Sequence, residues 1–335
     1  MSGNKQVILA SLPQGPLSVD HFEVRDAEVP KPGPGELLCR TVLLSLDPAN
    51  RAWMNGATYR DQQQAAEVMS GFTLCQVIDP NGSDVPAGAI VACEAGWQEY
   101  AAVPASSARI VRRGDEPLEH HMGVLGITGL TAYFGLFDIG KPIPGDTVVV
   151  SAASGATGSV AGQLARLAGA RVVGITGSDE KNAVLINELG FDAALNRRSD
   201  TFWADLKAAC PDGVDVYFDN VGGEILDNML YRMNLGGRVI CCGAVSTYDD
   251  PTVSTGSKVG FGMTVIKRLT VAGFIVLDHL DRWPAAEKRL AQLINAGKLT
   301  ALMETIEGLE NAPQALIGLL AGENVGKRII RVGAE

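Results

Sequence analysis

The sequence predicts an α/β fold of two domains, a mostly β N-terminal domain and a doubly wound parallel-sheet domain. Three observations lead to this fold class. The first 124 residues are rich in glycine and proline and contain only short strand-like runs. From residue 125 onward, strands and helices alternate, which is typical of a parallel sheet covered by helices. Between residues 146 and 169, a glycine-rich turn joins a strand to a helix.

Composition and charge limit the class of partner. The 335 residues are 46% hydrophobic and 20% charged, as expected for a soluble globular protein with two cores. The formal net charge is −10 and there is no basic run, which argues against nucleic acid and anionic membranes as partners. The N-terminus lacks the apolar core of a signal peptide, so we expect a cytoplasmic protein. Its six scattered cysteines are interpreted as core thiols.

Turn signals divide the N-terminal part into short strands. Proline and glycine cluster at residues 30–35, and Asn81-Gly82 marks a second turn. We expect strands at residues 6–10, 37–44, 74–78, 89–93 and 100–103.

The chain is organised around the stretch from residue 146 to residue 169. Residues 147–151 form a β-branched run, typical of a buried parallel strand. The sequence ASGATG follows at 153–158, with the G-x-G-x-x-G spacing of a dinucleotide-binding turn and alanine in the first place. Gly155 would let the backbone approach a pyrophosphate, and Gly158 would let the helix pack closely on the strand.

The helix after this turn is expected to bury Val160, Leu164 and Leu167 on one face. Free N–H groups at its start would form a diphosphate site. The alternative interpretation is a tight turn of an α/β fold that binds no nucleotide.

Alternation continues through the rest of the chain. An interior helix is expected at residues 123–137. Further strands are expected at 171–175, 193–195, 214–218, 238–242 and 269–274, with helices at 179–189, 200–210, 224–234 and 282–296. The tail adds a helix at 312–320 and a strand at 327–332.

The tip of the second strand of this sheet favours NADP over NAD. An NAD enzyme usually has an acid here to bind the ribose 2′-hydroxyl, but the tip reads TGS at 176–178. Asp179 and Glu180 come slightly later, where carboxylates suit the first turn of a helix.

Basic residues near the same tip would serve a 2′-phosphate. Lys181, Ser178 and the backbone of Gly177 are placed to hold it, and Arg197-Arg198 bring further positive charge. The alternative is that these are solvated surface charges.

Seven motifs, in order over nearly the whole chain, resemble those of one enzyme group. They are LDP (46–48), GWQEY (96–100), GLTAY (129–133), ASGATG (153–158), FDNVGG (218–223), CGAVSTY (242–248) and GENVGK (322–327). The sequence resembles the zinc-independent double-bond reductases of the medium-chain dehydrogenase/reductase superfamily, which include prostaglandin, plant alkenal and bacterial curcumin reductases. The resemblance implies a GroES-like catalytic domain of residues 1–124 and 304–335, and a Rossmann NADP-binding domain of residues 125–303.

The resemblance also implies an activity and a set of site residues. The activity is NADPH-dependent reduction of the C=C bond of α,β-unsaturated ketones or aldehydes, with hydride transfer to the β-carbon. Asn220 would lie at the nicotinamide-side ribose, Phe274 and Val276 would offer backbone contacts to the carboxamide, and Asn324 would close the pocket. The full cofactor-binding set is Gly155, Ala156, Thr157, Gly158, Gly177, Ser178, Lys181, Arg197, Asn220, Cys242, Tyr248, Phe274, Val276 and Asn324.

Tyr248 is the expected catalytic residue, because it matches the family tyrosine beside the substrate. Its phenol would stabilise the enolate oxygen or protonate the α-carbon, a role that the cofactor ribose hydroxyl could share. Without the resemblance, Tyr248 would be interpreted as an ordinary loop residue. Trp53, Met54, Tyr59 and Met69 are given no catalytic role.

Two departures from the family pattern affect the site. The family commonly has Asn-Tyr after the third strand, where this chain has Asn196-Arg197, and Arg197 is expected to serve the phosphate instead. The family often has Asp-Pro-Tyr-Met-Arg near the substrate mouth, where this chain reads DPANR at 47–51. The missing aromatic leaves the shape of the substrate open.

No metal is expected. Zinc-dependent relatives need cysteine, histidine and an acid at fixed places, whereas the first-ligand loop here reads Ser45-Leu46-Asp47. The adjacent His120 and His121 are interpreted as surface or interface residues.

Two other functions remain open from the sequence. One is a zinc-independent NADPH quinone reductase of the same superfamily, and the other is a non-catalytic NADPH-binding protein. A homodimer is expected, with the apolar run at 269–277 at the edge that joins the sheets.

Overall fold

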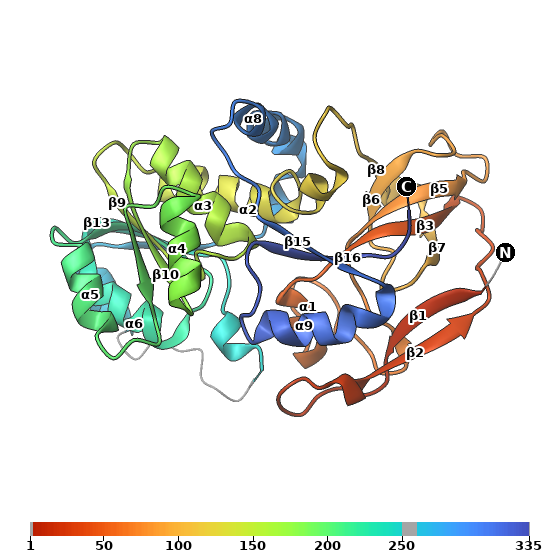
Figure 1. The fold of residues 1–335 in the computed structure, drawn as a ribbon, viewed down its shortest axis with the longest axis horizontal. Coiled ribbons are helices and arrows are strands. Elements are labelled where there is room, and N and C mark those ends of the chain that lie inside the picture. The colour runs from red at the N-terminus through yellow and green to blue at the C-terminus, as the bar shows by residue number, and fades with distance from the viewer. Residues whose placement is uncertain (1–2, 250–259, 335) are drawn as a thin grey trace.

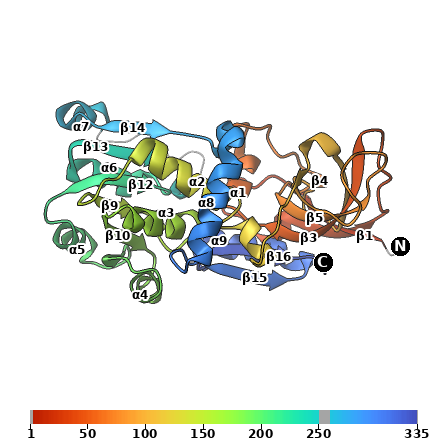
Figure 2. The same cartoon turned by 90° about the horizontal axis from the view of Figure 1, so that it is seen from above.

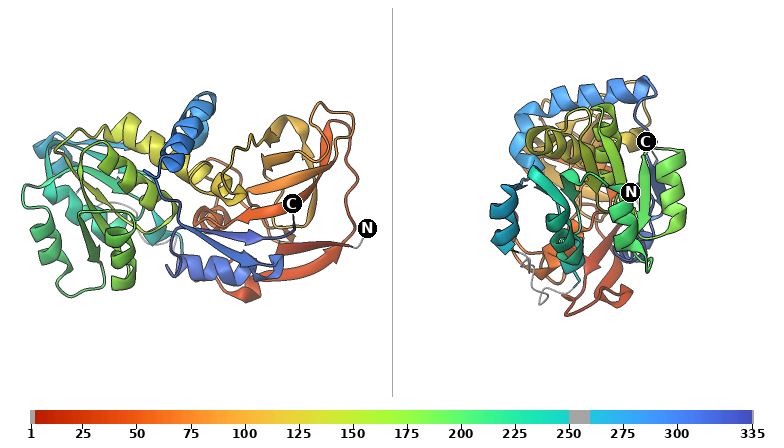
Figure 3. Two further views of the ribbon diagram at one scale, coloured as in Figure 1. Left: turned by 45° about the horizontal axis from the view of Figure 1, so that its top comes forward. Right: turned by 90° about the vertical axis from the view of Figure 1, so that its left-hand side faces the viewer.

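The structure, a computed structural model, describes residues 3–249 and 260–334 and has two halves (Figure 1). One half is rich in antiparallel strands and contains both termini of the described chain. The other half is a parallel sheet with helices on both faces. Figures 2 and 3 show α8 (Trp283–Asn295) lying between the halves on one side of the molecule.

The parallel sheet has the doubly wound topology expected from the alternating pattern. Its strand order is β11-β10-β9-β12-β13-β14, and every pairing in it is parallel. The order reverses between β9 and β12, so the carboxyl ends of these two strands open the crevice where such sheets bind ligands. In chain order its elements are α2 (Ile127–Phe134), β9 (Thr147–Val150), α3 (Ala156–Leu167), β10 (Arg171–Thr176), α4 (Asp179–Asn187), β11 (Ala193–Asn196), α5 (Phe202–Ala209), β12 (Val214–Asp219), α6 (Gly223–Arg232), β13 (Met233–Cys241), α7 (Gly260–Lys267), β14 (Thr270–Gly273) and α8.

The β-rich half has two sheets, and the tail of the chain returns to one of them. Strands pair in the orders β2-β1-β4 and β15-β16-β3-β5-β6-β8, with β7 also on β3. β16 runs antiparallel to β3, with Ile329 opposite Ser45, so the C-terminal strand belongs to the sheet of the β-rich half. The elements are β1 (Asn4–Leu9), β2 (Phe22–Ala27), β3 (Glu36–Ser45), α1 (Ala49–Asn55), β4 (Glu67–Val68), β5 (Thr73–Asp79), β6 (Ile90–Cys93), β7 (Tyr100–Pro104), β8 (Arg109–Ile110), β15 (Met303–Glu307), α9 (Ala312–Leu320) and β16 (Lys327–Arg331).

Two sequence interpretations are wrong. Leu167 is 40% exposed, because the buried face of α3 runs through Ala161 and Ala165 and its last turn ends beside a surface loop. His121 is buried rather than on the surface: its Nε2 lies 3.1 Å from Glu116 and its Nδ1 lies 3.4 Å from Glu287 of α8. Two acids from different elements therefore hold this histidine at the junction of the halves.

The interior helix expected at 123–137 begins later and changes pitch. Regular helix starts at Ile127, and Gly135–Gly140 continue as a π-helical turn. None of the described helices is long and apolar enough to span a membrane.

Candidate active site

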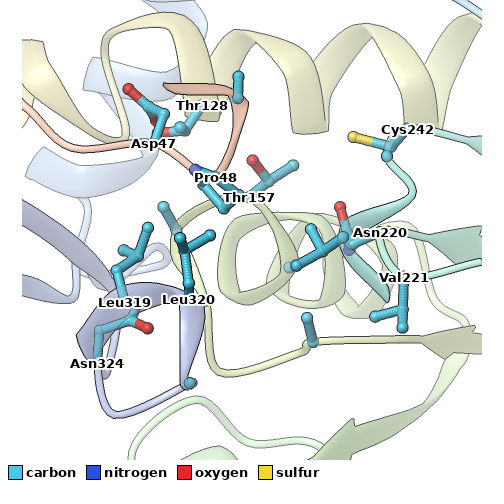
Figure 4. A pocket seen from close by; sticks show the side chains of 18 of the residues that line it. Asp47, Pro48, Thr128, Thr157, Asn220, Val221, Cys242, Leu319, Leu320 and Asn324 are labelled. Atoms are coloured by element: carbon cyan, nitrogen blue, oxygen red, sulfur yellow. The ribbon is translucent and has the colours of Figure 1, made fainter. Parts of the chain in front are cut away.

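A cleft of about 700 Å³ lies between the two halves. Asp47 and Pro48 reach it from the β-rich half, Asn324 from the tail, and Thr157 and Asn220 from the parallel-sheet half (Figure 4). Of the predicted site residues, all except Ser178 line the cleft. The fold thus brings together residues that are far more than half the chain apart, such as Asp47 and Asn324.

The glycine turn presents the start of α3 to this cleft. Gly155 is the N-cap residue, and the N–H groups of Ala156, Thr157 and Gly158 have no intrahelical acceptor. A Cβ on Gly158 would lie 2.4 Å from the carbonyl oxygen of Ala152, so only glycine allows the helix to pack this close. The free N–H groups and the positive end of the helix dipole suit a diphosphate.

The tail closes over this turn. Gly326 donates its N–H to the carbonyl oxygen of Ser154 at 2.7 Å and forms a bridge with Gly155. The Lys181 ammonium donates to the carbonyl oxygens of Gly322 and Asn324 at 2.5 and 2.7 Å. The side-chain amide of Asn324 donates to the carbonyl oxygen of Gly326, which keeps this loop compact.

Positive charge gathers at this end of the cleft, and acids among the described residues match only part of it. Burial is the main cause that lowers the pKa of Lys181 below its ordinary value, and Arg328, Arg198 and Arg197 lower it further. Arg328 pairs with Glu304, but neither Arg197 nor Arg198 has a carboxylate partner among the described residues. An anion bound here would relieve the mutual repulsion of these cations.

The acids that follow β10 do not point into the cleft. Asp179 and Glu180 are exposed in the first turn of α4, and Asp179 accepts a hydrogen bond from the Asn196 amide at 3.1 Å. Ser178 caps α4 by accepting from the Lys181 N–H, so it positions Lys181 instead of lining the cleft. A ribose 2′-hydroxyl would find no carboxylate here, whereas a 2′-phosphate would find cations.

Asn220 is held rigidly at the carboxyl end of β12. Its backbone N–H donates to the Ser151 hydroxyl at 2.9 Å, and its side-chain amide donates to the Ser151 carbonyl oxygen at 2.7 Å. The next turn is fixed by buried Asp219, whose Oδ1 accepts from the N–H groups of Val221 and Gly222. The amide oxygen of Asn220 is left to accept from a ligand hydroxyl.

Cys242 lies beside Asn220 in Figure 4, at the end of β13. Burial, with a smaller contribution from the charge of Asp219, raises the pKa of its thiol to about 12. The sulfur is therefore a protonated, apolar lining atom near neutral pH, and a thiolate nucleophile is not available there.

The segment after β14 lines the cleft with backbone. The Val276 carbonyl oxygen accepts from the Trp283 indole at 3.2 Å, which fixes the direction of its peptide group. The Phe274 ring fills the space beside Gly135, where a Cβ would lie 2.7 Å from it. Phe274 therefore fixes the segment by packing against Gly135 while it lines the cleft.

Tyr248 follows β13 and lines the cleft, whereas Lys181 and Arg197 follow β10 and β11, on the other side of β9 and β12 in the sheet order. Its phenol oxygen accepts the Ala244 N–H at 3.3 Å, so the hydroxyl proton is free to be donated. Burial is the main cause that raises the pKa of the phenol above its ordinary value. Trp53, Tyr59 and Phe72 add an aromatic wall here, with the Trp53 indole donating to the Tyr59 hydroxyl at 3.2 Å.

Comparison with known proteins places this geometry in a family. Residues 5–111 match the model of the N-terminal domain of oxidoreductase, and residues 156–292 match that of zinc-binding dehydrogenase. An NADPH-dependent curcumin reductase of Escherichia coli is 39% identical, with 99% of this chain and 98% of that protein covered. The NADP-dependent 2-alkenal reductase of Nicotiana tabacum is 35% identical, with the same coverage of both chains.

A solved structure has the same fold. The crystal structure of CurA from Vibrio vulnificus in complex with NADPH superposes with a TM-score of 0.93 at 37% identity, over 99% of this chain and 100% of that one. The chain belongs to the NADP-dependent double-bond reductases of the medium-chain dehydrogenase/reductase superfamily. The resemblance seen in the seven motifs is thereby confirmed.

The residues of this family member fit NADP(H). The open start of α3 suits the diphosphate, and Lys181 with Arg197 and Arg198 forms an anion site where no acid intrudes. The prediction of NADP as cofactor is confirmed at the level of the family, whose named members above use it.

The loop at residues 45–47, where zinc-dependent relatives have their first metal ligand, holds an ion pair in this chain. The Lys327 ammonium lies 2.6 Å from Asp47 Oδ1 and donates to the Leu46 carbonyl oxygen at 2.7 Å. Within residues 3–249 and 260–334, no group of three or more His, Cys, Asp or Glu side chains is arranged to hold a metal. Metal independence itself stays a prediction.

Sequence reasoning missed two features of the site. The Lys327–Asp47 pair joins opposite ends of the chain, and no local pattern signals it. Buried Arg51 and half-buried Asn55 of α1 contact residues 249 and 248 across the cleft. The only signal for these was the DPANR motif, which the resemblance placed at the substrate mouth.

Proposed function

We propose that the protein uses NADPH to reduce the C=C bond of α,β-unsaturated ketones and aldehydes, without a metal. One observation carries this proposal. A single cleft joins an unpaired cation cluster and an open helix start at one side to an apolar, aromatic region with the Tyr248 hydroxyl at the other. The activities named for its relatives support the same reaction.

The chain's own groups would handle the charge and the proton. NADPH, when bound, supplies the hydride. Reduction of an enone at its β-carbon leaves negative charge on the carbonyl oxygen and an α-carbon that needs a proton. Tyr248 donates to that oxygen or protonates that carbon, because its oxygen only accepts from the Ala244 N–H and burial keeps the phenol neutral.

Other residues of the cleft would bind the cofactor and exclude water from the substrate. Lys181, Arg197 and the N–H groups at the start of α3 would hold the phosphates, and Asn220 would accept from a ribose hydroxyl. Phe72, Trp53 and Tyr59 would cover the apolar part of the enone and keep water from the reacting carbons.

The experiment is a substrate panel under NADPH. A medium-chain 2-alkenal, a 3-alken-2-one, a curcumin-like dienone and a quinone are each incubated with and without a chelator, and the products are identified. We expect a saturated aldehyde or ketone from at least one enone, at a rate that the chelator does not change. Turnover of the quinone alone would move the protein to the quinone reductases, and binding of NADPH without any turnover would make it a non-catalytic binder.

The proposal extends to compartment, domains and assembly. All six cysteines are free thiols, which supports a reducing compartment such as the cytoplasm. Pairing of β15 with β16 and of β16 with β3 supports assigning residues 304–335 to the catalytic domain with residues 1–124, and residues 125–303 to the NADP-binding domain. The proposed assembly is a homodimer joined at the edge of β14, which pairs only with β13 among the described strands.

A further inference from the structure

The segment that carries Tyr248 is anchored by the other half of the molecule. Arg51, in α1, has a side chain with no exposed surface. Its Nε donates to Asp249 Oδ1 at 3.1 Å, and its Nη2 donates to the Gly15 carbonyl oxygen at 2.9 Å. Its Nη1 donates to Asn55 Oδ1, and the Asn55 amide in turn donates to the Tyr248 carbonyl oxygen at 2.7 Å. Two consecutive residues at the end of the parallel-sheet half are thus bonded to one helix of the β-rich half.

The hydrogen bonds from α1 are suited to holding the backbone of residues 248–249 in one orientation. A planar guanidinium donates in fixed directions, so it holds its acceptors at a defined angle, which a lysine ammonium does not do. Asp249 is half-exposed, whereas the Arg51 side chain is fully buried. Without Asp249, Arg51 would be a buried, unpaired charge, so the pairing is needed mainly on the Arg51 side. The same helix supplies Ala49 and Trp53 to the cleft wall, so the anchor and the wall move together.

The side chain of Tyr248 has little else to orient it. Among the described residues, its hydroxyl has one hydrogen-bond partner, the N–H of Ala244, at the long distance of 3.3 Å. The direction of the phenol therefore depends mainly on where its backbone is held. The backbone anchors are the Asn55 amide and the Arg51 guanidinium.

We propose that Arg51 and Asn55 are positioning residues, which hold the 248–249 backbone on α1 and so aim the Tyr248 hydroxyl at the substrate across the junction of the halves. This inference rests on the proposed function, because it assigns Arg51 and Asn55 an effect through Tyr248. A small misplacement of a proton donor lowers turnover more than it lowers substrate binding. The expected signature is therefore a loss in kcat.

A double-mutant cycle tests the proposal. Arg51→Lys keeps the positive charge but loses the planar guanidinium with its fixed donor directions. It is expected to lower kcat about ten-fold and to leave the dissociation constant for NADPH unchanged. In a Tyr248→Phe background, the same substitution is expected to change kcat by less than about two-fold, since the group it positions is gone. Asn55→Asp, which keeps the acceptor for Arg51 and loses the donor to Tyr248, is expected to behave likewise.

Two further variants keep the test decisive. Asp249→Asn alters the anchor at a half-exposed carboxylate and so probes it if Arg51→Lys does not fold. Arg109→Lys is the matched control: Arg109 pairs with Glu287 of α8 at 2.9 Å, which also joins the halves but does not touch residue 248. Its effect on kcat, whatever its size, is expected to be the same in both backgrounds.

The outcomes separate this inference from the proposed function. Equal losses from Arg51→Lys in the wild-type and Tyr248→Phe backgrounds would show a merely structural contact and overturn the positioning role alone. If Tyr248→Phe itself leaves kcat unchanged, the catalytic role of Tyr248 fails and the positioning role fails with it. Enone reduction would then still be judged by the substrate panel.

Discussion

Tyr248 combines a fixed oxygen with a proton that stays on it through the physiological range. Removing the hydroxyl by Tyr248→Phe is expected to lower kcat by about ten- to a thousand-fold, the range for loss of one donor or acid. The ring remains, so packing around it is preserved and the melting temperature should change little. Steady-state kinetics on the best enone of the panel, with a melt of each protein, measure both effects.

The direction in which kcat should change with pH follows from the raised pKa of the Tyr248 phenol. Burial raises the pKa of the phenol, so the neutral, donating form persists beyond the ordinary tyrosine pKa of 10.0. The alkaline fall of kcat that depends on Tyr248 should therefore have its midpoint above pH 10, and Tyr248→Phe should lack it. A fall near neutral pH that disappears in the variant would contradict this placement of the phenol.

Lys181 is expected to decide between the two nicotinamide cofactors. Its ammonium lies in the cation cluster and also clamps the tail, so Lys181→Ala removes a phosphate partner and a loop contact together. We expect KM for NADPH to rise by about ten- to a hundred-fold, with a much smaller change for NADH. Arg197→Ala, which loses charge but no tail contact, separates the two causes.

For Arg197→Ala we expect KM to rise for NADPH and not for NADH, while the loop at residues 322–326 stays as ordered as in the unmodified protein. Tail order is measured by hydrogen exchange at residues 322–326. Comparable efficiency of the unmodified protein with NADH and NADPH would contradict the assignment of NADP. So would equal effects of Lys181→Ala on the two cofactors.

At the scale of single elements, the glycine turn shows how little freedom the fold leaves. In Gly158→Ala, the new Cβ would lie 2.4 Å from the Ala152 oxygen and 2.9 Å from the Ala153 Cα, both of them backbone atoms. Because neither neighbour is a flexible side chain, α3 must shift from β9, which costs about 1–3 kcal/mol of unfolding free energy. Denaturant unfolding of the cofactor-free protein measures this cost.

Gly177→Ala is the matched control for that measurement. A Cβ on Gly177 meets nothing within 4 Å, and its φ angle lies outside the left-handed region. We expect its unfolding free energy to stay within about 0.5 kcal/mol of the unmodified protein. A comparable loss from both substitutions would mean that crowding at Gly158 is not the cause.

Elements with a strong local pattern could be predicted from the sequence, and those without one could not. The helix at residues 312–320 follows from apolar spacing and lies where expected. Helix α3 follows the glycine turn as expected, but it begins at Ala156 and not at about residue 159. Strand β2 was missed because it is an exposed edge strand that buries no side chain fully, so it shows no alternating pattern. Helix α1 was missed because its seven residues carry buried Asn50 and Arg51, which read as surface residues.

The site follows the same division. Residues that act through backbone or turn geometry, such as Gly155 and Gly158, could be located from a motif alone. Contacts between distant segments, such as Lys327 with Asp47 or Arg51 with Asp249, depend on how the halves pack. No periodicity records such a contact, so only the folded chain reveals it.

At the scale of the whole molecule, the parallel sheet leaves one of its edges uncovered. Among the described strands, β14 pairs only with β13, and Figure 2 shows β14 and α7 at the outer side of the sheet, away from the β-rich half. Val271 of β14 is 44% exposed, and Val265 and Ile266 of α7 are 72% and 65% exposed. An exposed strand edge with apolar side chains is a template for pairing with another chain.

We expect a second copy of the chain to cover this edge, which gives a homodimer with the sheets joined strand to strand. Val271→Lys places a charge at the centre of the edge and is expected to shift the protein toward monomer, because a desolvated, unpaired ammonium opposes the contact. Light scattering coupled to size-exclusion chromatography measures the mass of the 35.2 kDa chain and its assembly. Ile143→Lys is the control, since Ile143 is 62% exposed in the loop that leads into β9. A dimer that survives Val271→Lys, or a monomer before any substitution, would rule out this edge as the interface.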